Sequence, residues 1–259
     1  MPGKLDLSLA IACYNEEVVL EDSVRQIVEI LDNTRWTYEI IFVDDCSQDR
    51  TRDIIEGLLG DYRDKNMRKL LHERNRGRGR TVTDGLRMAC GDVAGYIDID
   101  LEVHARYIPS LVLAVRNGAD IATAHRIYKV QPRLFGRFIL STGYAWLMRN
   151  LLEVKLKDTE TGFKFFNRER ILPILDQVED EHWFWDTEIM VRSCLQGYSV
   201  VEIPCLFIRR YDKKSTVRVF RDTLDYFAKL LRFRQVVKLM RATARHDQAV
   251  SPIPISSSD

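Results

Sequence analysis

Three acidic residues stand two positions apart at the end of a short apolar run, in residues 94–102. If the chain stays extended, alternation along a strand places Asp98, Asp100 and Glu102 on one side. Carboxylates this close repel one another unless a cation lies between them. Mg²⁺ or Mn²⁺, shared between carboxylate oxygens and the phosphates of a substrate, would supply that charge. The alternative is an acidic strand end that meets solvent, because Asp-x-Asp is a frequent pattern.

Other polar side chains also follow apolar runs. Residues 5–13 and 38–43 are apolar enough for buried strands, and each is followed by residues at helical spacing. This alternation predicts an α/β fold, a mostly parallel sheet with helices on both faces. In such sheets the ligand binds beyond the carboxyl ends of the strands. The side chains expected at those ends are Asn15, Asp44, Asp45, Asp98 and Asp100.

The remaining pattern completes the expected element order. Short strands are predicted at 70–71, at 121–124 and at 199–203, and helices at 80–89, at 134–152 and up to residue 195. Asn15 is expected to be the N-cap of the first helix. Residues 218–245 predict a basic amphipathic helical region, and the tail 246–259 has a disordered composition. The chain thus divides into a domain at 1–217, this helical region and the tail.

Composition narrows the function. The chain has 259 residues, 46% hydrophobic and 30% charged, and its net charge of +1 gives no reason to expect nucleic acid binding. Five scattered cysteines favour neither zinc nor a disulfide framework. No apolar stretch is long enough for a membrane span, and no signal peptide is recognisable. We expect a cytoplasmic protein, with peripheral attachment to the inner face of a membrane as a hypothesis.

Taken in order, these motifs resemble glycosyltransferase family two, and most closely the polyprenyl-phosphate sugar transferases of the dolichyl-phosphate mannosyltransferase type. The resemblance spans about residues 5–222. It is carried by the segments 14–16, 44–47, 75–80, 98–100, 158–163 and 185–188. It implies a GT-A fold, a Rossmann-like three-layer arrangement around a mostly parallel sheet. It also implies a nucleotide-sugar donor, for which both UDP and GDP are compatible with the 44–47 turn.

The resemblance assigns residues to the donor. The residues implied to bind the nucleotide and the donor are Tyr14, Asn15, Glu16, Asp44, Asp45, Arg78 and Asp98. Arg78 takes a position where the family usually has lysine. Asp98 and Asp100 match the metal-binding pair, and Glu102 occupies a position, often Gln, that can also face the metal.

The resemblance also implies an acceptor site for a polyprenyl phosphate. Arg126, Arg137 and Ser141 match the spacing of its phosphate-binding residues, with Arg133 a competing candidate. Arginine suits this task because its planar fork can hold phosphate by two bonds. A basic loop follows, with Arg210, Lys214, Ser215 and Arg218. This loop either touches phosphates or is an exposed basic loop, and together with the helix after it suggests contact with an anionic membrane surface.

Asp158, Asp186 and Asp100 are the implied catalytic acids. A phosphate acceptor is already ionised, so Asp158 is expected to orient groups and at most to act as a weak base. The expected reaction is one in-line displacement that inverts the anomeric carbon. One alternative is a soluble hydroxyl acceptor, which would need Asp158 or Asp186 as a base. The other is a nucleotide-binding protein without catalysis.

Overall fold

The computed structural model describes residues 5–128, 151–152, 154–210 and 219–250, with the side chains of α8 described for 226–242. Its centre is a seven-stranded sheet in the order β3-β2-β1-β4-β6-β5-β7. The strands are β1 (Leu7–Cys13), β2 (Tyr38–Asp44), β3 (Asn66–Leu71), β4 (Val93–Ile97), β5 (Ile121–Tyr128), β6 (Phe163–Asn167) and β7 (Val200–Phe207). The helices are α1 (Leu20–Asp32), α2 (Thr51–Asp61), α3 (Arg78–Met88), the 3₁₀ turn η1 (Ala105–Tyr107), α4 (Ile108–Arg116), α6 (Arg168–Leu175), α7 (Trp185–Leu195) and α8 (Val219–Val250).

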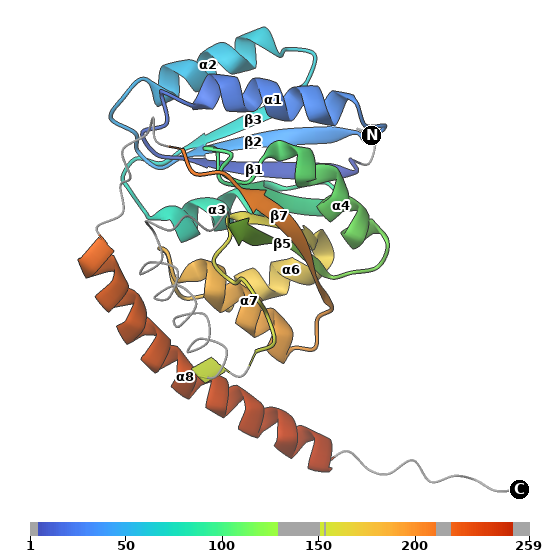
Figure 1. Ribbon diagram of the computed structural model, residues 1–259, viewed down its shortest axis with the longest axis vertical. Coiled ribbons are helices and arrows are strands. Elements are labelled where there is room, and N and C mark those ends of the chain that lie inside the picture. The colour runs from blue at the N-terminus through green and yellow to red at the C-terminus, as the bar shows by residue number, and fades with distance from the viewer. Residues whose placement is uncertain (1–4, 129–150, 153, 211–218, 251–259) are drawn as a thin grey trace, which may run out of the picture.

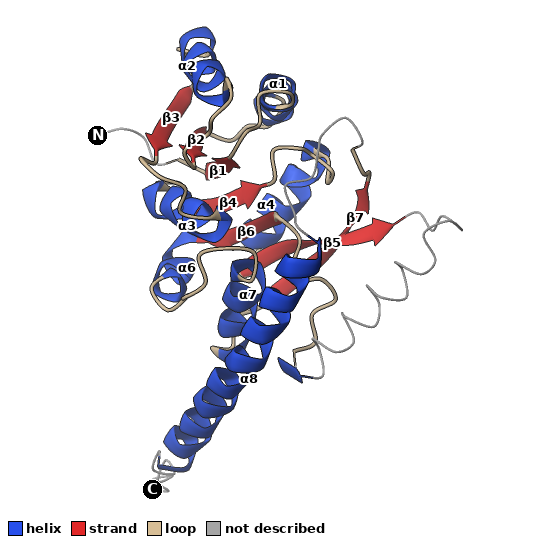
Figure 2. Cartoon of the chain, turned by 90° about the vertical axis from the view of Figure 1, so that its left-hand side faces the viewer, coloured by secondary structure: helices blue, strands red, loops and turns tan. Residues whose placement is uncertain are grey.

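Helices cover both faces of the sheet, as the strand–helix alternation predicts. Figure 2 shows α1 and α2 on one side of the strands and α3, α6 and α7 on the other. Side chains of β1 alternate between the two apolar cores, because Leu9 and Ile11 pack beneath α1 whereas Ala10 packs beneath α3. The predicted three-layer α/β fold is therefore confirmed.

One strand runs against the others. β6 lies between β4 and β5 and is antiparallel to both, whereas the remaining neighbours pair in parallel. The start of β6 therefore lies at the edge where β4 and β5 end. Residues that precede β6 join the side chains expected at the carboxyl ends of the parallel strands.

The helix α8 lies outside the sheet layers. Leu230, Phe233 and Val237 pack with Phe184 and Val191 in a third apolar cluster, and the helix projects past the body of the molecule (Figure 1). Its last residue is Val250, so the helix continues five residues beyond the predicted boundary at 245. Residues 246–250, which belong to the predicted tail, extend the same helix.

Several local predictions differ from the structure. Asn15 does not cap α1: the helix begins at Leu20, and Asn15 has a positive φ of 56° in the loop before it. The predicted strand at 70–71 begins four residues earlier, and that at 121–124 continues to Tyr128. We did not predict β6 and α6. The antiparallel β6 interrupts the strand–helix rhythm on which the prediction rested.

Candidate active site

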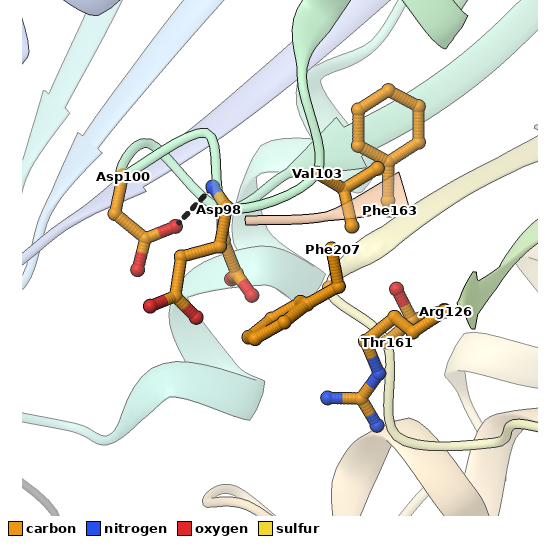
Figure 3. Close-up of a pocket in the computed structure, with 9 residues that line it drawn as sticks. Asp98, Asp100, Val103, Arg126, Thr161, Phe163 and Phe207 are labelled. Carbon is orange, nitrogen blue, oxygen red and sulfur yellow. Dashed lines mark hydrogen bonds between the residues drawn. The ribbon is translucent and has the colours of Figure 1, made fainter. Parts of the chain in front are cut away.

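A pocket opens at the sheet edge where β4, β5 and β7 end and β6 begins. Its lining residues are Asp98, Asp100, Glu102, Val103, Arg126, Thr161, Gly162, Phe163 and Phe207. In Figure 3 the carboxylates of Asp98 and Asp100 lie on one side, the guanidinium of Arg126 lies on the other, and the Phe207 ring lies between them. The pocket thus combines acidic groups with a cation.

The acidic triplet reaches this pocket through a turn. β4 ends at Ile97, and Leu101 has a positive φ of 52°, so the chain does not stay extended through the triplet. The backbone N–H of Glu102 donates to Asp100 Oδ1 at 3.2 Å and fixes the turn (Figure 3). Strand alternation was therefore the wrong reason for expecting Asp98, Asp100 and Glu102 together, although all three line the pocket.

The geometry constrains how a metal could bind. Within the part of the chain that the structure describes, no three or more His, Cys, Asp or Glu side chains form a group able to hold a metal ion. Glu102 Oε1 accepts a bond from the backbone N–H of Arg210 at 3.1 Å, which ties this carboxylate to the loop after β7. Mg²⁺ is commonly bound by one or two carboxylates with substrate phosphates completing the shell. Asp98 and Asp100 fit that pattern.

Arg78 lies beside the acidic triplet at the start of α3. Its Nη2 donates to Asp98 Oδ1 at 2.7 Å, and its Nη1 donates to Asp186 Oδ2. The same guanidinium packs near the rings of Tyr96 and Trp183. Burial alone would lower the pKa of Arg78, but its two carboxylate partners outweigh it and raise the pKa above its usual value.

Asp186 is buried beneath this arginine, with 2% of its surface exposed. Its Oδ1 accepts bonds from Lys164 Nζ at 2.8 Å and from the Tyr96 hydroxyl. Burial alone would raise the pKa of Asp186, but Arg78 and Lys164 outweigh it and hold the pKa below its usual value. Desolvation lowers the pKa of the fully buried Lys164. With both oxygens occupied, Asp186 is placed to anchor Arg78.

Arg126 and Asp158 form a second pair within the site. Arg126 Nε donates to Asp158 Oδ2 at 2.7 Å and Nη2 donates to Oδ1 at 2.9 Å. Burial alone would raise the pKa of Asp158, but the guanidinium lowers it below the usual value. The rings of Tyr128 and Phe207 lie beside Arg126. The sequence suggested separate roles for the two residues, and the structure joins them.

The two loops expected to bind the nucleotide are fastened to each other. The backbone N–H of Asn15 donates to Ser47 Oγ at 2.9 Å, and Asn15 Oδ1 accepts from the backbone N–H of Gln48 at 2.8 Å. The backbone N–H of Glu16 likewise donates to Thr51 Oγ1 at 2.8 Å. Tyr14 precedes these contacts and remains 38% exposed.

Asp44 lies at the end of β2 and is fully buried. Its Oδ2 accepts from Arg52 Nε at 2.6 Å and from the backbone N–H of Ser47 at 3.1 Å, whereas Oδ1 is buried with no hydrogen-bond partner. A buried acceptor without a partner is costly, and such an atom is expected to meet a ligand donor. The nucleotide contact of Asp44 stays a prediction.

Asp45 supports the loop at Arg76 and Gly77 by hydrogen bonds. Its Oδ1 accepts from the backbone N–H of Arg76 at 2.7 Å and its Oδ2 from that of Gly77 at 2.9 Å, while His72 Nδ1 lies 2.8 Å from Oδ1. Gly77 has a φ of 94°, and an added Cβ would overlap the carbonyl of Glu181. Asp45 therefore shapes the loop that leads into Arg78.

Six predicted residues lie outside the described part of the chain: Arg133, Arg137, Ser141, Lys214, Ser215 and Arg218. Arg210 is described, and its Nη1 lies 3.5 Å from the carbonyl of Asp100. Lys164 and Tyr96 were missed. The sequence signal for Lys164 was its position as one lysine inside the aromatic run 163–166, and we found no such signal for Tyr96.

Comparison with known proteins decides the family. The sequence profile of glycosyl transferase family 2 matches residues 8–172, more than half of the chain. The chain belongs to glycosyltransferase family 2. This confirms the family expected from the motifs.

Curated members of the family share much of this sequence. The glycosyltransferase AglD of Haloferax volcanii is 34% identical over 233 residues, covering 88% of this chain and 37% of AglD. The dolichyl-phosphate beta-glucosyltransferase of Dictyostelium discoideum is 28% identical, with 76% and 64% covered. The dolichol-phosphate mannosyltransferase of Pyrococcus furiosus is 32% identical, with 95% and 67% covered. The chain therefore spans only part of the length of these relatives.

Solved structures of other proteins share the fold. The glucosyl-3-phosphoglycerate synthase of Mycobacterium tuberculosis bound to UDP superposes with a TM-score of 0.65 at 17% identity, covering 89% of this chain and 80% of the synthase. This similarity confirms the predicted GT-A fold. Among the described helices, none is long and apolar enough to cross a membrane.

Proposed function

We propose that this chain transfers a sugar from a UDP- or GDP-sugar to a polyprenyl phosphate with the help of Mg²⁺ or Mn²⁺. The observation that carries the proposal is the pocket in which Asp98 and Asp100 face Arg126 (Figure 3). Carboxylates suit a cation shared with a diphosphate, and arginine suits an acceptor phosphate. Two relatives named for transfer to dolichyl phosphate support the proposed acceptor. A structural neighbour solved with Mn²⁺ and UDP-glucose supports the proposed donor and metal.

The donor nucleotide is proposed to lie against the loops 14–17 and 44–48. The partnerless Asp44 Oδ1 is an acceptor at the position where a base would enter. An acceptor there suits the ring N–H of either uracil or guanine. Tyr14, Asn15 and Glu16 would complete the nucleotide site, and Asp45 would support it through the Gly77 loop.

The proposed reaction is a single displacement. A phosphate oxygen of the acceptor forms a bond to the anomeric carbon as the bond to the nucleoside diphosphate breaks, which inverts the configuration. When bound, the divalent cation would stabilise the charge on the departing diphosphate, held by Asp98 and Asp100 with Glu102 nearby. Arg126, with Arg137 and Ser141 as further candidates, would hold the acceptor phosphate.

The two buried acids then have supporting roles. The acceptor phosphate is ionised and requires no general base. Asp158 is already paired with Arg126, and Asp186 is enclosed by Arg78, Lys164 and Tyr96. We propose that Asp158 orients Arg126 and that Asp186 anchors Arg78.

The helix α8 supports a proposed attachment to an anionic membrane at the cytoplasmic face. Its exposed apolar side chains Phe227, Leu231 and Leu239 alternate with exposed Arg234 and Lys238. Such a surface binds anionic lipid through apolar insertion and charge. Residues 1–217 would form the catalytic domain, which would end in the basic loop with Arg210, Lys214 and Ser215, and Arg218 would begin the helical region.

Co-sedimentation with liposomes tests the membrane proposal. The wild-type chain should bind liposomes that contain anionic lipid, and Leu239→Glu should reduce this binding. Leu113→Glu changes an exposed leucine on α4 and is the matched control. Equal binding by all three proteins would contradict an attachment through α8.

Nucleotide release tests the transfer reaction. The wild type is incubated with UDP- and GDP-sugars and Mn²⁺ or Mg²⁺, with and without a short polyprenyl phosphate. Release that requires lipid phosphate and metal, and that is lost in Asp100→Asn, supports the proposal. Asp64→Asn is the control, because this exposed carboxylate lies outside the site. Release that does not depend on the lipid would indicate a soluble acceptor instead.

A further inference from the structure

The two carboxylate partners of Arg78 differ in their exposure to solvent. Asp186 is buried, with 3% of its side chain exposed, and is held by Lys164 and Tyr96 as well. Asp98 has 48% of its side chain exposed and lines the pocket. The first contact is therefore fixed by its surroundings, whereas the second can be exchanged for a contact to a ligand.

The guanidinium occupies the oxygen that Asp98 would offer a cation. Arg78 Nε and Nη2 both donate to Asp98 Oδ1, at 3.2 Å and 2.7 Å. The other oxygen lies against Gly162, where an added Cβ would overlap the carboxylate. Both oxygens of Asp98 thus already have close neighbours. A divalent cation that approached would meet a positive charge within bonding distance of its own ligand.

The protein alone also offers few metal ligands. Over the described ranges, no group of three or more acidic, histidine or cysteine side chains could hold a metal ion. The remaining ligands would have to come from a diphosphate. A diphosphate brings negative charge to which the fork of Arg78 can turn.

We propose that Arg78 is the built-in counter-cation of Asp98, so that the divalent cation binds tightly only together with the nucleoside diphosphate. When the diphosphate binds, the Arg78 guanidinium donates to it in place of Asp98. Asp98 then becomes available to the cation, and each ligand increases the affinity for the other. Arg78 is a positioning residue in this proposal. The inference rests on the proposed donor and metal site, and it adds the coupling between the two ligands of that site.

Mn²⁺ binding to the full chain tests this without any transfer assay. Free Mn²⁺ is followed by electron paramagnetic resonance, with and without UDP. Arg78→Gln removes the competing charge and should bind Mn²⁺ about tenfold more tightly than the wild type in the absence of UDP, because one charge a few ångströms away contributes on the order of this factor. UDP should then increase the Mn²⁺ affinity less in the variant than in the wild type, because the variant has no guanidinium for the diphosphate to draw away from Asp98.

Two further variants complete the design. Arg80→Gln removes the same charge from the same helix, where Arg80 pairs with Asp84, and should leave Mn²⁺ binding unchanged. Arg78→Lys keeps a charge beside buried Asp186 but lacks the fork that reaches both carboxylates. If Arg78→Gln does not fold, as judged by circular dichroism, the lysine variant should still bind Mn²⁺ about threefold more tightly than the wild type.

The outcomes separate this inference from the proposed function. UDP-dependent Mn²⁺ binding in the wild type, together with unchanged affinity in the folded Arg78 variants, would overturn the inference alone. An equal gain in Arg80→Gln would do the same, because the effect would then be one of general charge. Absence of Mn²⁺ binding in every protein, with and without UDP, would overturn the proposed metal site as well.

Discussion

Arg126 and Asp158 hold each other by two parallel hydrogen bonds, and a third runs from the backbone N–H of Arg126 to Asp158 Oδ2 at 3.2 Å. The arginine is the proposed acceptor ligand, and the aspartate was a candidate base. The bonds make the carboxylate a poor proton acceptor, because the guanidinium stabilises its charged form. They also hold one side of the Arg126 guanidinium, so that an acceptor phosphate would meet it in a fixed orientation.

Asp158→Asn should destabilise the fold by about 2–3 kcal/mol, because it leaves a mostly buried guanidinium with only Glu160, 3.8 Å away and partly exposed, as a counter-charge. Only 21% of the Arg126 side chain and 9% of that of Asp158 are exposed. Urea unfolding followed by circular dichroism measures the change. Asp176→Asn is the control, since its pair with Arg87 is exposed and its loss should change stability by less than about 1 kcal/mol. Equal effects of the two variants would contradict the importance of burial here.

Stability should fall in acid, partly through the same pair. The folded-state pKa of Asp158 is below the ordinary value of 3.8. The stabilisation is therefore present above that ordinary value and is lost as the pH falls through the folded-state pKa. Urea midpoints from pH 5 to pH 2 should drop more steeply in the wild type than in Asp158→Asn. Parallel curves would show that Asp158 does not contribute to the acid transition.

Gly162→Ala should reduce nucleotide release at least about tenfold while the fold survives. An added methyl group would overlap the Asp98 carboxylate. The backbone N–H of Asp98 also donates to the Gly162 carbonyl at 2.7 Å. Displacing this carboxylate weakens the proposed cation site, and a displacement of about 1 Å can cost 10²-fold in rate. Initial rates over a range of Mn²⁺ concentrations measure the effect.

The matched control is Gly57→Ala on α2, where an added Cβ meets nothing within 4 Å. This change should leave the rate unchanged and increase stability by about 0.5–1 kcal/mol, because alanine favours a helix interior over glycine. A Gly162→Ala enzyme with the wild-type rate and the wild-type Mn²⁺ dependence would argue against a role for the observed position of Asp98.

Asp44→Asn should weaken UDP binding about tenfold, measured by titration calorimetry in the presence of Mn²⁺. The buried Oδ1 is an acceptor without a partner, and an amide would present a donor either there or towards Arg52. Asp53→Asn, on the exposed side of α2, should bind UDP like the wild type. Unchanged affinity in Asp44→Asn would place the base elsewhere.

Local patterns predicted the ends of β2 and β4. Asp44 and Asp98 both come at the end of apolar runs, and parallel strands bring such ends to one edge of the sheet, so their shared edge could be predicted from the pattern. The turn at Leu101 could not be predicted, because a positive φ in a leucine is set by its surroundings and contradicts its own preference.

Contacts between distant segments were beyond the sequence. Lys164 lies in an aromatic run and could have been an exposed strand residue, yet it is fully buried against Asp186, 22 residues away. Its burial depends on β6 entering the sheet between β4 and β5, and nothing local specifies that insertion. Arg126 and Asp158 are 32 residues apart, and their pairing depends on the same arrangement.

The insertion of β6 also has a consequence for how the molecule acquires its site during synthesis. The loops proposed to bind the nucleotide and the acidic triplet are complete once about residue 102 has been made, but β4 then lacks its neighbour on one side. A nascent chain at that stage carries an unpaired strand edge made of buried residues, which is prone to aggregation. When Phe163 pairs with Ile97, one event covers this edge and brings Thr161 and Gly162 to the pocket. Assembly of the site is thus coupled to closure of the sheet.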